Sequence, residues 1–188
     1  MRVRAMGPLL LAAAMLVSVV GLAAPAGAGG GSFNCSGAGG TMTASPGLKL
    51  FDGQSNTLSW TQSGLACTGG FTSAGNLTAK MQTPKAVRCS GIVGIVDAGT
   101  ATIVWTNPAN FGKTTMKLNM KITSTSGHVT SGTLSGVVTT AGSNFASGKA
   151  VTGAFTLGKG LHSTQSGGDC TVTTQLTTFP ITAISLHT

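Results

Sequence analysis

The sequence predicts an all-β protein, namely a single antiparallel β-sandwich or open barrel of about nine or ten strands that is stapled by two disulfides. Three observations predict this fold class. Apolar and polar residues alternate with period two in several segments, and turn signals separate these segments. The 188-residue chain has 29 glycines, many threonines and serines, and few residues that favour helices. It also has four cysteines, an even number.

The longest clean alternation covers residues 114–123, which we expect to form the central strand. Apolar side chains there alternate with threonine, lysine and asparagine. A helix is the alternative, because Lys113, Lys117 and Lys121 are spaced by four residues. In a helix, however, the apolar residues would spread around the axis instead of forming a stripe. The apolar set consists of Met116, Leu118, Met120 and Ile122.

Residues 1–28 have the pattern of a signal peptide, which leaves one domain at residues 29–188. Arg2 and Arg4 form a positive start, residues 9–24 are apolar, and an A-x-A cleavage site follows at residues 26–28. A transmembrane anchor is the alternative, but the small residues and Pro25 favour cleavage. No later segment is long enough and apolar enough to span a bilayer. We therefore expect a secreted or cell-envelope-associated protein with no membrane span after cleavage.

Several strands are expected before the central one, each bounded by a turn signal such as Ser45-Pro46-Gly47, Asp52-Gly53 or Asn107-Pro108. Leu58 and Trp60 share one face of their strand. The expected segments are residues 41–43, 48–51, 55–62, 76–81, 87–96 and 100–106.

The strands expected after the central one are rich in threonine, valine and glycine. Gly132 and Gly136 indicate bulges or breaks in the first of them. The last strand follows Pro180 and is expected at a sheet edge, because proline cannot donate to a central ladder. A loop at residues 158–168 carries Lys159 and His162. The expected segments are residues 128–140, 147–157, 169–176 and 181–186.

The four cysteines, Cys35, Cys67, Cys89 and Cys170, are expected to form two disulfides in an exported chain. Three connectivities are possible, and we prefer Cys35–Cys67 with Cys89–Cys170. Zinc binding is the alternative, but there is no C-x-x-C pair and export favours oxidation. We expect no metal and no cofactor.

Several motifs resemble a family of small exported four-cysteine β-proteins that is common in actinobacteria. The run GTATIVWTN at residues 99–107 is followed by the long alternating strand, by HVTSGTLSG at residues 128–136 and by DCT at residues 169–171. The resemblance covers most of residues 29–188. It implies a fold and an exported location, and it implies no activity. One departure is Asn107-Pro108, where a glycine-containing turn is expected.

The sequence offers little for catalysis, and we expect no enzyme. A glycosidase needs paired carboxylates, whereas Asp52 and Asp97 are most simply turn residues. A small secreted hydrolase that uses His162 and Asp169 is the alternative, although the chain has no G-x-S-x-G elbow. His128 is expected to be solvated.

Nucleic-acid binding is not indicated, because basic residues do not interleave with aromatic ones. Trp60 and Trp105 lie on apolar faces, where core packing is the expected role. No nucleotide-binding glycine motif is present.

The net charge and the lysines of the central strand suggest the expected function. Loss of Arg2 and Arg4 would lower the net charge from +8 to +6, which suits anionic polymers or membrane surfaces. Lys113, Lys117 and Lys121, hereafter the lysine row, would share the outward face with a spacing of about 13 Å. We expect a non-catalytic domain that binds anionic surface polymers through this row. The alternatives are a row that only keeps the surface soluble, and an effector or inhibitor that binds another extracellular protein through residues 158–168.

Overall fold

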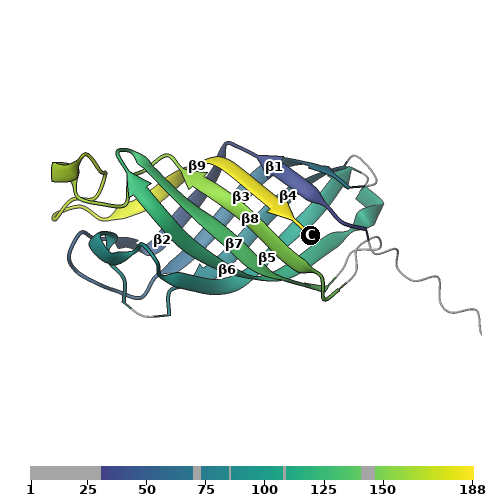
Figure 1. Cartoon of the computed structure of the whole chain (residues 1–188), viewed down its shortest axis with the longest axis horizontal. Helices are drawn as coiled ribbons and strands as arrows, with labels where there is room; N and C mark the ends of the chain where they lie inside the picture. Colours follow the sequence, from purple (N-terminus) through teal and green to yellow (C-terminus); the bar gives the residue numbers. More distant parts are fainter. Residues whose placement is uncertain (1–30, 70–72, 85, 108, 141–146) are drawn as a thin grey trace, which may run out of the picture.

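The computed structural model describes residues 31–188 except residues 70–72, 85, 108 and 141–146. The expected signal peptide lies outside the described residues. Eight antiparallel strands close into a barrel, and a ninth strand extends it (Figure 1). The strands are β1 (Asn34–Gly37), β2 (Gly40–Leu48), β3 (Thr57–Thr68), β4 (Ser73–Gln82), β5 (Val96–Asn107), β6 (Lys113–Ser126), β7 (Val129–Thr140), β8 (Ala150–Leu157) and β9 (Leu176–His187).

The barrel is a meander in which each strand from β2 to β9 pairs with its neighbour in sequence. It closes because β9 also pairs with β2. Closure gives every strand a partner on both sides and therefore removes the exposed edges of an open sheet. This topology confirms the all-β class, and the structure also contains the two expected disulfides. The expected sandwich or open barrel is corrected to a closed barrel, and the expected edge position of residues 181–186 is wrong.

The extra strand β1 continues the line of β2. Ser36 opposes Ala66 in β3, and Thr41 opposes Thr61, so the register is unchanged across the break. The same two segments pair with β9 on their other side. The Gln62 side chain of β3 stabilises the break between β1 and β2. Its Nε2 donates to the Ala38 carbonyl within the break at 2.7 Å and to the Ser63 carbonyl at 2.9 Å.

Three expected strands are largely loops in the structure. Of residues 48–51 only Leu48 belongs to a strand, the end of β2, and the other two segments are residues 87–96 and 169–176. Residues 87–96 contain the short helix η1 (Cys89–Gly91) and a turn at Gly94, whose φ is +85°. Residues 169–176 form an isolated bridge at Cys170 and then bend until β9 begins. These last two segments each hold a cysteine of the Cys89–Cys170 disulfide. Val87 and Ile92 of residues 87–96 are buried and cover the end of the barrel, whereas Val93 and Val172 are exposed.

The core fills the barrel interior with alternating large and small residues. In the central row, Leu118 of β6 lies between Gly99 of β5 and Gly136 of β7. A Cβ at Gly136 would overlap the Lys117 carbonyl and crowd the Leu118 side chain. A narrow barrel cannot hold a large side chain at every inward position, which explains the glycines in these strands.

Aromatic rings pack at separate levels of the interior. Trp60 and Phe155 meet edge to face with ring centroids 5.2 Å apart. Trp105 packs in the same way against Phe33 at 6.0 Å, and its Nε1 donates to Thr114 Oγ1 at 2.9 Å. Both tryptophans are therefore buried, as expected for core residues.

The two disulfides form the pairs that we preferred from the sequence. Cys35 and Cys67 directly oppose each other on β1 and β3, and Cys89–Cys170 joins the loops before β5 and before β9. Two structural disulfides are typical of an oxidising, extracellular environment.

The long loops gather at the end of the barrel away from the C-terminus (Figure 1). We call the described residues of 49–56, 83–95 and 158–175 the loop cap. Contacts between the three loops tie it together. Cys89–Cys170 joins the second and third loops, and the Cys89 N–H donates to the Lys49 carbonyl of the first at 2.9 Å. Gln54 and Val87 form a β-bridge between the first two loops.

Candidate functional site

The lysine row lies on the outer wall of the barrel, as the alternation predicts. Lys113, Lys117 and Lys121 are exposed in β6, and the apolar residues between them are buried. The pairing of β4, β5 and β6 adds a fourth cation that we did not predict. Lys80 of β4 pairs with Thr100 of β5, which in turn pairs with Lys117. The spacing of adjacent strands puts Lys80 and Lys117 about 10 Å apart at the backbone.

These four lysines, hereafter the lysine face, have no ion-pair partner among the described residues. The three aspartates of the chain all lie elsewhere. Asp97 is buried inside the barrel, while Asp52 and Asp169 lie in the loop cap. The outer wall of β4 to β6 therefore has a positive charge that no side-chain carboxylate of the same surface neutralises.

Three adjoining hollows lie on the lysine face and share Thr100. One of about 540 Å³ is lined by Lys117, Asn119 and Val137, among others, and one of about 350 Å³ by Lys80 and Gln82. The third, of about 160 Å³, lies beside Lys80 and is lined by threonines. The inward glycines Gly99 and Gly136 line the largest hollow with backbone alone. Ammonium, hydroxyl and amide groups thus surround a shallow trough, a chemistry that suits an extended anionic chain with hydroxyl groups.

Sequence analysis missed Lys80 because the sequence does not reveal which strands are neighbours. The alternation of Leu77, Ala79 and Met81 already places Lys80 on an outward face. Only the barrel topology puts that face two strands from the lysine row.

The hydrolase alternative requires His162 beside Asp169, but no hydrogen bond joins these two side chains. His162 Nδ1 lies 3.0 Å from Thr125 Oγ1, and its Nε2 lies 3.2 Å from the Ser166 carbonyl. Asp169 instead accepts from His128 Nδ1 at 3.1 Å and from the Gly160 N–H at 2.6 Å. Both ring nitrogens of His162 are thus occupied by contacts that hold its loop.

The Asp169 carboxylate is a local anchor of the loop cap. Burial would raise the pKa of Asp169, but the hydrogen bond from the Gly160 N–H and then the bond from His128 outweigh burial. Together with the charges of Lys159 and His128, they hold the pKa below its ordinary value of 3.8. The ionised Asp169 therefore connects the loop at residues 158–175 to the turn between β6 and β7.

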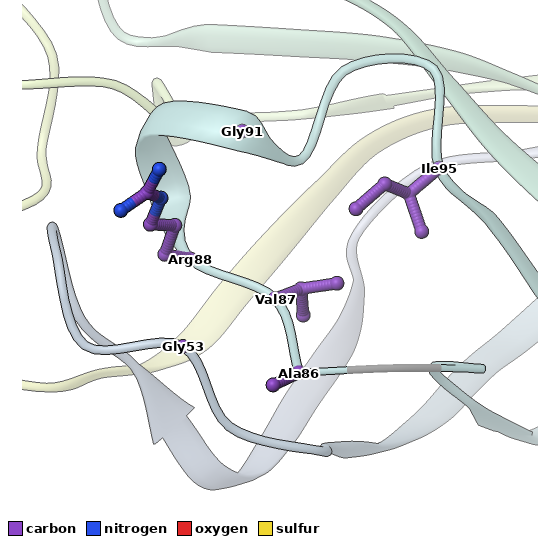
Figure 2. Close-up of a pocket in the computed structure, with 6 residues that line it drawn as sticks. All are labelled: Gly53, Ala86, Val87, Arg88, Gly91 and Ile95. Atoms are coloured by element: carbon purple, nitrogen blue, oxygen red, sulfur yellow. The ribbon is translucent and has the colours of Figure 1, made fainter.

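A pocket of about 340 Å³ lies in the loop cap between residues 49–56 and 83–95. Figure 2 shows Val87 and Ile95 facing each other, while the guanidinium of Arg88 points away from both. Gly53, Ala86 and Gly91 complete the lining. Among the described residues, the lining side chains are aliphatic apart from Arg88.

No group of three or more histidine, cysteine, aspartate or glutamate side chains among the described residues could hold a metal ion. Nor does any helix in that part of the chain have the length and apolar character needed to cross a membrane. No family model, curated protein or solved structure matches this chain. The resemblance noted from the motifs stays a prediction.

Proposed function

We propose that this protein is a non-catalytic extracellular domain that attaches to anionic polymers of the cell envelope through the lysine face. The observation that carries the proposal is the set of four exposed lysines without a carboxylate on the same surface. Uncompensated cations on a rigid wall attract a polyanion without the cost of breaking existing ion pairs.

The arrangement of the lysines favours an extended ligand over a small one. The lysine row runs along β6 with a spacing of about 13 Å, and Lys80 lies about 10 Å to one side. No single small anion could contact all four ammonium groups. A phosphate polymer or an acidic glycan could place successive charges along the row, while Thr100 and Asn119 offer hydrogen bonds within the trough.

Binding through exposed lysines should be salt-sensitive, because mobile ions screen charges across a wet surface. The test is co-sedimentation of the protein with purified bacterial envelope at low and high salt. The protein should come from the medium of an exporting host, with its N-terminus checked by mass spectrometry. We expect binding at low salt that weakens about tenfold or more at high salt.

Substitution of the three row lysines by glutamine should abolish binding without unfolding the domain. A triple variant of Lys49, Lys149 and Lys159 loses the same charge outside the lysine face and is the matched control. Equal loss in both triple variants would mean that only net charge matters. Full binding by the row variant would refute the proposal. Polyphosphate and polygalacturonate as competitors then separate phosphate from carboxylate polymers.

A further inference from the structure

The loop cap has a second surface whose chemistry differs from that of the lysine face. Each of its three loops exposes one large apolar side chain. Phe51 is 58 % exposed, Val93 is 48 % exposed and Val172 is 62 % exposed. In the part of the chain that the structure describes, Phe51 is the only phenylalanine among the exposed large hydrophobic residues.

The three apolar side chains lie on loops that are connected to one another. Phe51 lies two residues from Gly53 and Val93 two residues from Gly91, and both glycines line the pocket in Figure 2. Val172 follows Cys170, which is bonded to Cys89 at the start of η1. Because these connections hold the loops together, the apolar side chains are displayed at one end of the barrel without an ordering cost on contact.

One cation of the loop cap is uncompensated. Lys49 pairs with Asp52 at 3.3 Å, and Lys159 lies 3.7 Å from Asp169. Arg88 has no ion-pair partner among the described residues, and it lines the pocket while its guanidinium points away from Val87 and Ile95 (Figure 2). An unpaired guanidinium on the loop that also exposes Val93 matches a molecule with an anionic head and an apolar body.

We propose that the loop cap binds the surface of a membrane that contains anionic lipids. Phe51, Val93 and Val172 enter the boundary between head groups and acyl chains, and Arg88 contacts a lipid phosphate. Apolar side chains at loop tips beside a cation are the features that hold a protein at a bilayer interface, and affinity depends on both. This proposal is independent of the lysine face.

A second copy of the chain is a less favourable occupant. A two-fold contact through the loop cap would bring both Arg88 side chains into one interface. No unpaired carboxylate of the loop cap is available to neutralise them, because Asp52 and Asp169 already have cationic partners. An anionic lipid surface supplies the missing negative charge.

The test is co-sedimentation with vesicles of phosphatidylcholine alone and vesicles with about one third phosphatidylglycerol. The wild type should bind the anionic vesicles. Replacement of Phe51, Val93 and Val172 by serine, hereafter the cap variant, should weaken binding about tenfold or more, because it removes the inserted apolar area. The control replaces Val104, an exposed valine of the wall outside the hollows described above, and should bind like the wild type. Arg88→Gln should weaken binding more than Lys113→Gln, which removes one charge from the wall.

A fluorescence measurement tests insertion directly. Trp60 and Trp105 are each 2 % exposed, so their emission should not change on binding. In Phe51→Trp the added tryptophan should shift to shorter wavelength on anionic vesicles. Circular dichroism and thermal melting should show that each variant is folded.

Three results would overturn the proposal. The first is no binding of the folded wild type to anionic vesicles. The second is that the row variant no longer binds vesicles while the cap variant still does, which would assign vesicle binding to the lysine face. The third is a dimer in analytical ultracentrifugation that the cap variant abolishes, without vesicle binding, which would make the occupant a second copy.

Discussion

Asp97 of β5 lies directly opposite Met120 of β6, and both side chains are buried inside the barrel. Asp97 is 1 % exposed, and its Oδ1 has no hydrogen-bond partner among the described residues. Burial raises the pKa of this carboxyl from 3.8 to about 6. Asp97 is therefore a buried residue of β5 and not the simple turn residue that the sequence indicates. At neutral pH its buried charge destabilises the folded protein.

Because the folded protein holds the Asp97 proton more tightly than the unfolded chain, this residue makes stability fall as pH rises from 3.8 to about 6. The penalty at neutral pH is at most about 3 kcal/mol. Asp97→Asn should therefore raise the free energy of unfolding at pH 7 and change it little at pH 3.5. Chemical denaturation of both proteins at the two pH values measures this difference. An equal effect at both would show that ionisation of Asp97 is not the cause.

Asp169 should show the opposite dependence, because its pKa is lowered in the folded protein. Its stabilising effect is present above the ordinary pKa of 3.8 and is lost as pH falls through the lowered folded value. In Asp169→Asn at neutral pH, the Gly160 amide should exchange its hydrogen faster, because it donates to Asp169 Oδ2. Hydrogen exchange by NMR measures this, with the Thr102 amide in the barrel wall as the internal control. Unchanged exchange at Gly160 would mean that other contacts hold the loop.

The sequence predicts the parts of this fold that depend on local pattern. The alternation at residues 114–123 predicts β6 and its outward lysines, and the cysteine count predicts the disulfides. Closure of the barrel is not predictable in this way, because it depends on the pairing of β9 with β2 across most of the chain. The register of β4, β5 and β6 places Lys80 two strands from Lys117. The contact of Asp169 with His128, and not with His162, depends on how the loop at residues 158–175 packs against the turn between β6 and β7. Residues 87–96 are apolar enough for a strand, but they cover the barrel end because Cys89 is held by Cys170.

The two disulfides should differ in their effect on the loop cap. Cys89–Cys170 spans 81 residues and Cys35–Cys67 spans 32, so loop-closure entropy predicts losses of about 4.5 and about 3.7 kcal/mol on removal. Only the first loss should loosen the cap, because Cys35 and Cys67 lie on strands that are already paired. Trypsin should therefore cut next to Arg88 or Lys159 faster in Cys89→Ser/Cys170→Ser than in Cys35→Ser/Cys67→Ser. Equal cutting in the two folded double variants would show that backbone contacts alone hold the cap.

Gly136 should tolerate no side chain, because the barrel interior requires a small residue beside Leu118. An added Cβ would overlap the Lys117 carbonyl, which the β6–β7 pairing holds in place. Gly136→Ala should therefore lower the free energy of unfolding by about 2–3 kcal/mol, through crowding and not through loss of an interaction. Ser135→Ala changes the adjacent outward position and should have little effect.

Two further comparisons test the cause of the loss in Gly136→Ala. Gly91→Ala, where the nearest atom is 3.9 Å away on Arg88, should be tolerated. If Leu118→Ala restores part of the stability lost in Gly136→Ala, then crowding against the Leu118 side chain contributes to the cost. Additive losses in the double variant would instead assign that cost to the backbone of β6.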